Sequence, residues 1–194
     1  MEDVILFDVG NVIVRGSHEI THRIMRAKGV SPENAVKFFQ NPEYREFSRG
    51  KITGTDFHRA LCDKYLGREL TYQEVMNAHN EHIDSLDQYV VGVLNTVDNS
   101  RLAFVTDTNE WQTAKERDLI TLSDYNERVF RSHKIGMLKT DEACFPYVIE
   151  RLGVQPGRIT LVDDSIEKIQ MAQRFGINTI LFTEGMDLLE RIKL

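Results

Sequence analysis

Short apolar runs alternate with longer amphipathic segments through the second half of the chain, and one more such run stands near its start. The runs are rich in β-branched and aromatic residues, and they cover 4–7, 102–105, 129–130, 159–162 and 178–182. The segments between them repeat apolar residues at helical spacing, and two end at Gly153 and Gly176. Strands that alternate with helices predict a parallel sheet built with right-handed crossovers. The predicted fold class is therefore α/β, a Rossmann-like sheet with helices on both faces and with 178–182 as its last central strand.

Residues 15–85 interrupt this alternation with a pattern that is helical throughout. Four candidate helix starts carry a capping residue, and proline follows two of them directly: Ser31, Asn41, Thr55 and Thr71. No Gly- or Pro-rich linker separates the segment from its surroundings. We therefore predict an inserted all-helical cap at 15–85 on short hinges, carried by a core that comprises 1–14 and 86–194.

Composition and charge narrow the choice of function. The chain has 194 residues and a formal net charge of -6, which argues against a nucleic-acid or anionic-membrane binder. Cys62 and Cys144 lack CxxC spacing and indicate two thiols in a reducing compartment. Glu2 and Asp3 occupy the place of a basic signal-peptide region, and no apolar run approaches the roughly 20 residues of a membrane span. We expect a cytoplasmic protein, and the sequence leaves its oligomeric state open.

Polar side chains follow the predicted strands at the points where the strands end. Asp8 comes directly after the first strand, and Thr106 and Asp107 come after the second. The pair Asp163-Asp164 follows the fourth strand. Because the carboxyl ends of parallel strands share one edge of a sheet, we expect these groups to face a common crevice.

The chemistry of these groups suits a metal ion and a phosphate. Two carboxylates at close range repel each other unless a cation lies between them, and hard oxygen ligands favour Mg²⁺. The hydroxyl of Thr106, the turn N–H groups and Lys139, which follows the third strand, suit phosphate oxygens. Together they indicate metal-assisted phosphoryl transfer to a carboxylate, which depends on positioning and on charge neutralisation.

These groups occur in the order of the four motifs of the haloacid dehalogenase-like (HAD) superfamily of hydrolases, and the chain resembles that family over nearly its whole length. The resemblance implies that Asp8 is the nucleophile and becomes an aspartyl-phosphate. It implies that Thr106 and Asp107 bind the substrate phosphate. Lys139, in the pattern Ser-x-x-x-Gly-x-x-Lys, corresponds to the charge-stabilising lysine.

The same resemblance implies a Mg²⁺ site beside the nucleophile. Asp8 and Asp164 would ligate the ion with carboxylates and Gly10 with its backbone carbonyl, while Asp163 would support it from the outer sphere. The implied substrate is a small phosphorylated metabolite. The first motif, Phe-Asp-x-Gly-Asn-Val, resembles the subgroup that includes sugar-phosphate phosphatases similar to α-glucose-1-phosphatase.

Gly10 is the main departure from the family pattern. Most phosphatases of the family carry at this position an aspartate that protonates the leaving oxygen and later activates water. A general acid or base is worth about 10²–10⁴ in rate. We therefore expect a sugar 1-phosphate, with its better leaving group, to be turned over better than a sugar 6-phosphate. Gly10 also leaves open a metal-independent haloacid dehalogenase and a catalytically impaired scaffold that binds a phosphorylated ligand.

Several further charged residues lie in the predicted cap or near the motifs. Arg15, Arg49 and Lys51 are candidates for substrate contacts from the cap. Lys168 lies where relatives often carry an asparagine near the acidic motif, and the sequence assigns it no role. We expect the Asp107 side chain to cap the helix that follows it, with its N–H turned toward phosphate.

The segment His18-Glu19-Ile20-Thr21-His22 spells the zinc-protease pattern HExxH. On a helix this pattern would place two imidazoles on one face, with the glutamate as base. The pattern is short, however, and a third ligand would have to come from Glu43 or Glu46 without any motif to support it. We therefore interpret the segment as an ordinary polar helix face, and we interpret His79 and His82 as solvated helix residues.

Overall fold

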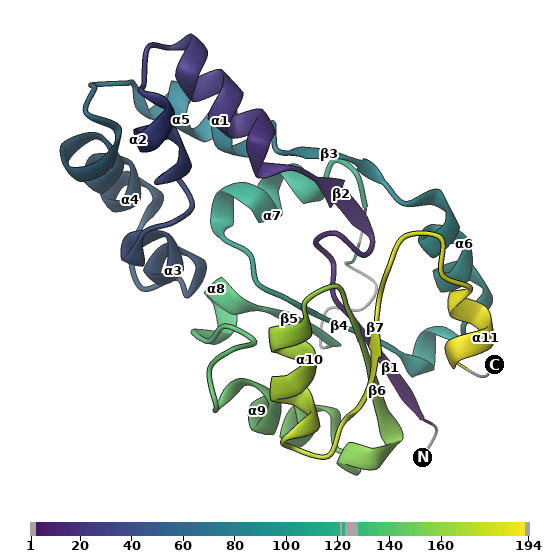
Figure 1. Ribbon diagram of the computed structural model, residues 1–194. Coiled ribbons are helices and arrows are strands. Elements are labelled where there is room, and N and C mark those ends of the chain that lie inside the picture. The colour runs from purple at the N-terminus through teal and green to yellow at the C-terminus, as the bar shows by residue number, and fades with distance from the viewer. Residues whose placement is uncertain (1–2, 121, 123–127, 193–194) are drawn as a thin grey trace.

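A parallel sheet forms the centre of the protein. The computed structural model describes residues 3–120, 122 and 128–192, and within them the central sheet has five strands in the order β5-β4-β1-β6-β7 (Figure 1). Every pairing in it is parallel, so the α/β prediction is confirmed. The strands are β1 (Val4–Phe7), β4 (Leu102–Thr106), β5 (Val129–Arg131), β6 (Ile159–Asp163) and β7 (Asn178–Leu181).

Helices connect these strands and cover both faces of the sheet. One face carries α6 and α11, and the other carries α9 and α10. The helical elements of this core are α6 (Gln88–Thr96), η2 (Asn99–Arg101), α7 (Glu110–Glu116), α8 (Ser132–Ile135), α9 (Cys144–Leu152), η4 (Pro156–Arg158), α10 (Ile166–Gln173) and α11 (Leu188–Ile192).

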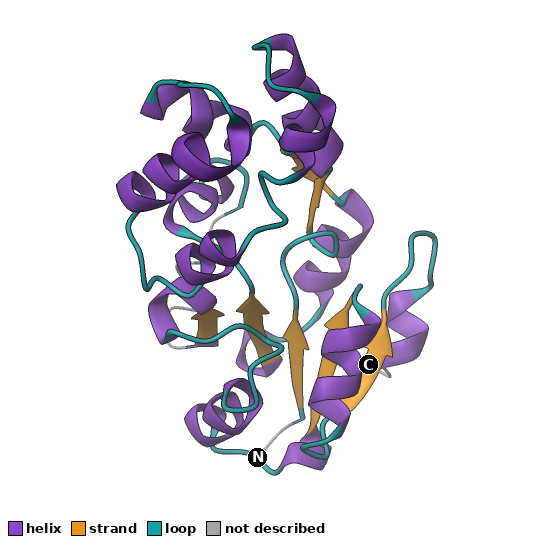
Figure 2. Cartoon of the chain, turned by 60° about the vertical axis from the view of Figure 1, so that its left-hand side comes forward, coloured by secondary structure: helices purple, strands orange, loops and turns teal. Residues whose placement is uncertain are grey.

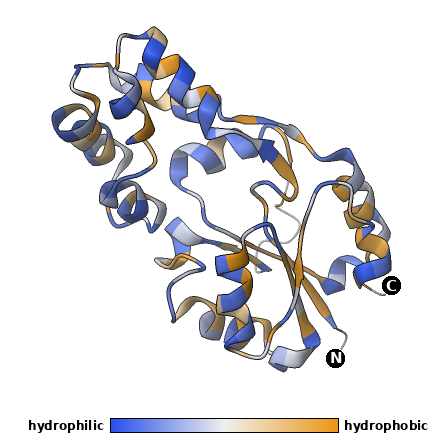
Figure 3. Ribbon diagram, viewed as in Figure 1, coloured by the Kyte–Doolittle hydropathy of each residue, from blue (hydrophilic) through white to orange (hydrophobic). Residues whose placement is uncertain are grey.

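The middle strand β1 explains why the apolar run at the start of the chain is continuous. Ile5 and Phe7 belong to the cluster under α6 and α11, whereas Val4 and Leu6 belong to the cluster under α9 and α10. Successive side chains of a strand point to opposite faces, so a strand buried on both sides has no polar alternation. Figure 3 shows this contrast between hydrophobic strands and helices of mixed polarity.

A helical lobe is inserted between β1 and the rest of the core. Its helical elements are α1 (His18–Ala27), α2 (Pro32–Val36), α3 (Pro42–Ser48), α4 (Gly54–Ala60), the π-helical turn η1 (Leu61–Leu66) and α5 (Tyr72–Asn80). The starts at Ser31, Asn41 and Thr71 are confirmed, because each side chain accepts a backbone N–H of its helix. The start predicted at Thr55 is wrong. Thr53 caps that helix, because its hydroxyl and the carboxylate three residues later together satisfy the first turn.

A two-stranded antiparallel ribbon joins the lobe to the core. It pairs β2 (Val14–Gly16) with β3 (Ile83–Leu86), and the sequence pattern did not predict it. β2 has only three residues, and the two middle positions of β3 are polar and exposed. The alternation of apolar and polar residues that predicts a strand is therefore too short to detect in either. In Figure 1 this ribbon lies between the lobe and the sheet.

The strand at the end of the chain lies at the edge of the sheet. We predicted a central position for 178–182, and that prediction is wrong, because β7 pairs with β6 alone within the described residues. Two of its four residues are exposed and two are half-buried. A short apolar run does not distinguish an edge strand from a central one.

Two further observations concern the thiols and the helices. Cys62 and Cys144 are free thiols, and Cys144 is buried under the sheet. Within the described part of the chain, no helix combines the length and the apolar character that crossing a membrane requires.

Candidate active site

The carboxyl ends of the parallel strands point toward the helical lobe (Figure 2), and Asp8 lies there at the end of β1. Its side chain is buried, and its N–H donates to the Val162 carbonyl oxygen at 2.9 Å, which holds it against β6. The chain then turns sharply, with Asn11 in the left-handed region at φ 57°. Glycine and asparagine both accept the left-handed conformation readily, but Gly10 has an ordinary φ and only Asn11 adopts it.

Lys139 is the cation at the centre of the site. Its side chain is fully buried, and Nζ lies 2.6 Å from Asp8 Oδ2 and 2.6 Å from Asp163 Oδ2. Its backbone N–H donates to Asp107 Oδ1 at 2.8 Å. The chain reaches this position because α8 ends at Gly136, whose φ of 76° suits glycine. An ammonium group this deeply buried depends on the carboxylates that compensate it.

Three carboxylates converge beside this lysine. Asp8, Asp163 and Asp164 each offer an oxygen within 4.8 Å of the others, and no other such group of three Asp, Glu, His or Cys occurs in the described residues. Burial, with the nearby charge of Asp8, raises the pKa of Asp163 to about 6. Burial acts in the same direction on Asp8, but the ammonium groups of Lys139 and Lys168 hold its pKa below the ordinary value. Crowded carboxylates call for a cation, and hard oxygen donors fit Mg²⁺.

Thr106 ends β4 and carries an unused hydroxyl. Oγ1 is buried and has no hydrogen-bond partner in the described structure. Leaving such a group unpaired costs about 1–3 kcal/mol, so a ligand is the natural explanation for it.

Asp107 does not cap the helix that follows it, and the prediction that it would is wrong. Asn109 stands directly before α7 and accepts the Gln112 N–H at 3.0 Å. Because this closer residue satisfies the first turn, the carboxylate of Asp107 is left to accept the Lys139 N–H.

The structure adds Lys168 to the site, a residue to which sequence reasoning gave no role. Its Nζ lies 3.6 Å from Asp8 Oδ2 and 3.8 Å from Asp107 Oδ2. Burial alone would lower the pKa of Lys168, but the carboxylates around it raise it above its ordinary range. Lys168 lies in the first turn of α10, and from there its side chain reaches the carboxylates at the ends of β1 and β4.

A cavity of about 620 Å³ lies over Asp8, between the core and the lobe. This volume is typical of small-molecule sites and leaves room for the organic part of a small metabolite. The core side of the cavity is formed by Asp8, Gly10, Asp107, Gln112, Asp164 and Lys168. The lobe contributes His18, Glu19, His22, Tyr44 and His82.

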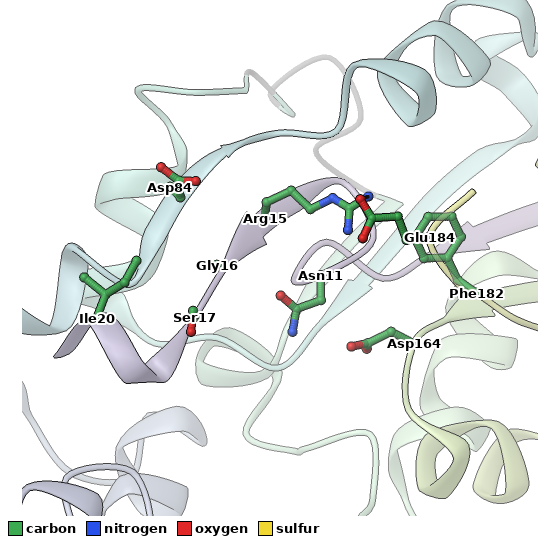
Figure 4. Close-up of a pocket in the computed structure, with 9 residues that line it drawn as sticks. All are labelled: Asn11, Arg15, Gly16, Ser17, Ile20, Asp84, Asp164, Phe182 and Glu184. Carbon is green, nitrogen blue, oxygen red and sulfur yellow. Dashed lines mark ion pairs between the residues drawn. The ribbon is translucent and has the colours of Figure 1, made fainter. Parts of the chain in front are cut away.

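A second pocket, of about 440 Å³, adjoins this cavity (Figure 4). Asn11, Arg15 and Asp164 line both. Arg15 pairs with Asp87 and lies 3.5 Å from Glu184. Arg15 therefore reaches the cavity, as proposed for a cap cation, but its charge is compensated by carboxylates.

The other two cap cations lie elsewhere. Arg49 donates to both oxygens of Asp141, at 2.8 and 2.6 Å, and so connects α3 of the lobe to the core. Lys51 is 57% exposed and lies 3.5 Å from Glu46. Neither lines the cavity over Asp8.

The two histidines of the HExxH segment belong to the cavity wall. His18 stacks on Phe39 with ring centroids 3.8 Å apart. His22 Nδ1 lies 3.4 Å from Glu19 Oε2. No third metal-ligating side chain completes a site with them in the part of the chain that is described.

His79 and His82 are buried, so the prediction that they are solvated is wrong. Their rings pack against each other with centroids 4.9 Å apart, and both contact Phe39. The sequence pattern favours polar surface positions for these two histidines, whereas in the structure their rings pack against aromatic rings of the lobe.

Comparison with known proteins agrees with this geometry. Residues 2–176 match the family model described as haloacid dehalogenase-like hydrolase. The D-ribitol-5-phosphate phosphatase of Bacteroides thetaiotaomicron is 25% identical over 195 residues, which cover 94% of this chain and 93% of the relative.

Solved structures share the fold. A HAD family enzyme from Bacteroides thetaiotaomicron, in complex with magnesium and inorganic phosphate, superposes with a TM-score of 0.85 at 20% identity, and 100% of each chain is covered. A HAD-like family hydrolase from Porphyromonas gingivalis superposes with a TM-score of 0.82 at 23% identity, over 99% of this chain and 96% of the other.

Proposed function

This chain belongs to the haloacid dehalogenase-like hydrolase family, and we propose that it is a Mg²⁺-dependent phosphatase of small phosphomonoesters. The relative named for D-ribitol 5-phosphate supports a sugar phosphate or similar metabolite as the substrate. The related structure with magnesium and inorganic phosphate supports the metal. We also propose that residues 15–85 act as a cap over a core of 1–14 and 86–194.

One observation carries this proposal. Three carboxylates, those of Asp8, Asp163 and Asp164, meet within 4.8 Å below a cavity, and a buried lysine joins two of them. With Asp107, these carboxylates outnumber the two lysines beside them, Lys139 and Lys168, and the excess of negative charge favours a further cation. The unpartnered hydroxyl of Thr106 at the neighbouring strand end supports a phosphate ligand.

In the proposed first step, a carboxylate oxygen of Asp8 attacks the phosphorus atom in line. The bond from phosphorus to the alcohol oxygen breaks, the leaving oxygen takes a proton from water, and an aspartyl-phosphate forms. Thr106 and Lys139 orient the phosphate oxygens and balance their charge. Lys168, at 3.6 Å from Asp8, adds positive charge on the cavity side.

Asp8, Asp164 and the Gly10 carbonyl would hold Mg²⁺, with Asp163 supporting them, and the bound ion would supply charge neutralisation. Water then attacks the phosphorus atom of the aspartyl-phosphate, which releases inorganic phosphate and restores the Asp8 carboxylate. The lobe excludes bulk water from this reaction.

Gly10 offers no carboxyl group to protonate the leaving alcohol, so substrates with good leaving groups should lose least. We expect kcat/KM for a sugar 1-phosphate to exceed that for the corresponding 6-phosphate, because the anomeric oxygen leaves more readily without a proton. Parallel kinetics on glucose 1-phosphate and glucose 6-phosphate measure this difference. Equal or reversed values would contradict it.

The test of the proposed function is a phosphate-ester panel with Mg²⁺, with Asp8→Asn as the blank. The substitution is nearly isosteric but removes the nucleophile, so we expect turnover to vanish while circular dichroism stays unchanged. Activity retained in Asp8→Asn would refute the assignment.

EDTA should abolish the wild-type activity, whereas EDTA-resistant release of halide from a haloacid would identify a dehalogenase instead. Tight binding of phosphorylated ligands without any turnover would identify the impaired scaffold.

A further inference from the structure

A histidine of the lobe has an unused hydrogen-bonding atom beside the cavity. His22 lies on α1, one turn after His18, and its side chain is only 12% exposed. Nε2 is buried and has no hydrogen-bond partner in the described structure, and the residue lines the same cavity as Asp8. Buried polar atoms are paired as a rule, so this one needs a ligand to explain it.

The neighbours of His22 determine what kind of ligand this is. A hydrogen bond from Arg26 lowers the pKa of Glu19, so Glu19 is ionised. Its Oε2 lies 3.4 Å from His22 Nδ1, so Nδ1 carries the proton and faces the carboxylate. In the neutral imidazole with this tautomer, Nε2 carries the lone pair and acts as an acceptor.

The rest of the lobe wall is also poor in positive charge. Besides Arg15, the side chains that the lobe adds to the cavity are Ser17, His18, Glu19, His22, Tyr44, His82 and Ile83. Burial, with the neighbouring rings of His82 and His22, lowers the pKa of His18 to about 4, so that side chain is neutral near pH 7. Two cations do line the cavity, but Lys168 lies beside the nucleophile and Arg15 is paired with Asp87.

The adjoining pocket continues the same chemistry. It is lined by the carboxylates of Asp84, Asp164 and Glu184, and Figure 4 shows Arg15 next to Glu184. A substrate that extends from Asp8 toward α1 therefore meets hydrogen-bond acceptors. Hydroxyl groups can donate to such a wall, whereas a carboxylate or a second phosphate would be repelled by it.

We propose that His22, oriented by Glu19, binds a hydroxyl group at the far end of the substrate, and that the substrates are monophosphates of alditols or sugars. This inference rests on the proposed phosphatase function, since the phosphate group fixes the other end at Asp8. The hydroxyl group donates to Nε2 of His22. Phe39 supports this arrangement, because its ring lies 5.8 Å from that of His22 and stacks on that of His18.

The test compares two substrates that differ in their hydroxyl groups. Ribitol 5-phosphate and n-pentyl phosphate both present a primary phosphate ester on a five-carbon chain. We expect the wild type to prefer ribitol 5-phosphate in kcat/KM. His22→Leu should reduce that preference about tenfold, as expected for one hydrogen bond to a buried group. His22→Gln keeps an acceptor and should retain more of the preference than His22→Leu. Arg23→Ala changes an exposed residue of the same helix and serves as the matched control.

Each outcome decides the question. If a folded His22→Leu protein keeps the full preference for ribitol 5-phosphate, the inference is overturned. The proposed phosphatase function still stands in that case, provided that hydrolysis of both esters depends on Asp8. An equal loss on both esters also overturns it, since that result describes a structural role. If neither ester is hydrolysed, calorimetric binding of ribitol 5-phosphate decides instead, and the phosphatase proposal is tested separately with the phosphate-ester panel that includes a sugar 1-phosphate. Weaker binding by about tenfold in His22→Leu then supports the site, and equal binding rejects it.

Discussion

The α/β core and the helical lobe meet around the cavity over Asp8, but their interiors contain different kinds of side chain. The core sandwiches its sheet between two mostly aliphatic clusters and collects charge at the strand ends, where Lys139 is buried among carboxylates. The lobe has an aromatic interior in which Phe38, Phe47 and Phe57 are fully buried and histidines contribute their rings. The core therefore supplies the charges beside the nucleophile, and the lobe supplies shape, aromatic rings and polar groups at the far side of the cavity.

The helix α7 shows how closely the two regions are coupled. Trp111 belongs to the core in sequence, but its ring lies in the aromatic cluster of the lobe, and its Nε1 donates to the Tyr72 hydroxyl at 2.7 Å. Five residues later on the same helix, Glu116 is buried near the site, where the charge of Asp8 contributes to its pKa. A change in either region can thus reach the other through this helix.

The largest expected effect comes from removing a ring of the lobe. Phe57 is fully buried, stacks on Phe47 at 4.9 Å and contacts Trp111 at 5.6 Å, so Phe57→Ala should lower the free energy of unfolding by about 4 kcal/mol. Hydrogen exchange should show the lobe amides opening while β1 and β6 stay protected. Phe145→Ala, at a fully buried position under the sheet, is the matched control and should expose the strands instead. Identical exchange patterns would show that the two regions unfold as one unit.

The core could be predicted from the sequence because its chemistry is tied to strand ends. A continuous apolar run followed by a carboxylate fixes where Asp8 lies, and the same reasoning holds for Thr106 and Asp163. Lys168 was not given a role because its place depends on how α10 packs against the sheet. The edge position of β7 was missed for a similar reason, since strand order depends on pairings far apart in sequence.

The lobe was harder to predict because its packing follows ring shapes and not a clear period. Helix starts could be found from capping residues, as at Ser31 and Thr71. The burial of His79 and His82 could not, because histidine serves equally well on a surface and in an aromatic interior. The unpartnered Nε2 of His22 becomes visible only when every contact around it is known.

A smaller effect should appear in the pH dependence of stability. Burial raises the pKa of Glu116 from 4.5 to about 7, so between these values the folded state holds a proton that the unfolded state has lost. The contribution of Glu116 to stability is therefore full below pH 4.5 and is lost as the pH rises to about 7, by up to ~3 kcal/mol. Glu116→Gln cannot ionise, so its urea-unfolding free energy should decline less than that of the wild type over this range, and the decline that Asp163 causes should remain. Glu150→Gln changes an exposed position and should show the same decline as the wild type. If Glu116→Gln also shows the full wild-type decline, the buried Glu116 is not its cause.

The smallest expected effect tests whether the core alone accounts for the chemistry. Apart from Gly10 and the residues on either side of it, no described heavy atom lies within 4 Å of the place that a Cβ at Gly10 would occupy, and the backbone there has an ordinary φ, so an aspartate fits without strain. Gly10→Asp should raise kcat/KM for ribitol 5-phosphate about tenfold, because the new carboxyl group protonates the leaving oxygen. The gain should be smaller on p-nitrophenyl phosphate, whose leaving group needs no proton. Gly10→Asn has the same shape but no acid, and it should give no gain. If Gly10→Asp also gives none, another group around the cavity already delivers the proton, and the lobe then contributes to the chemistry as well as to the shape of the site.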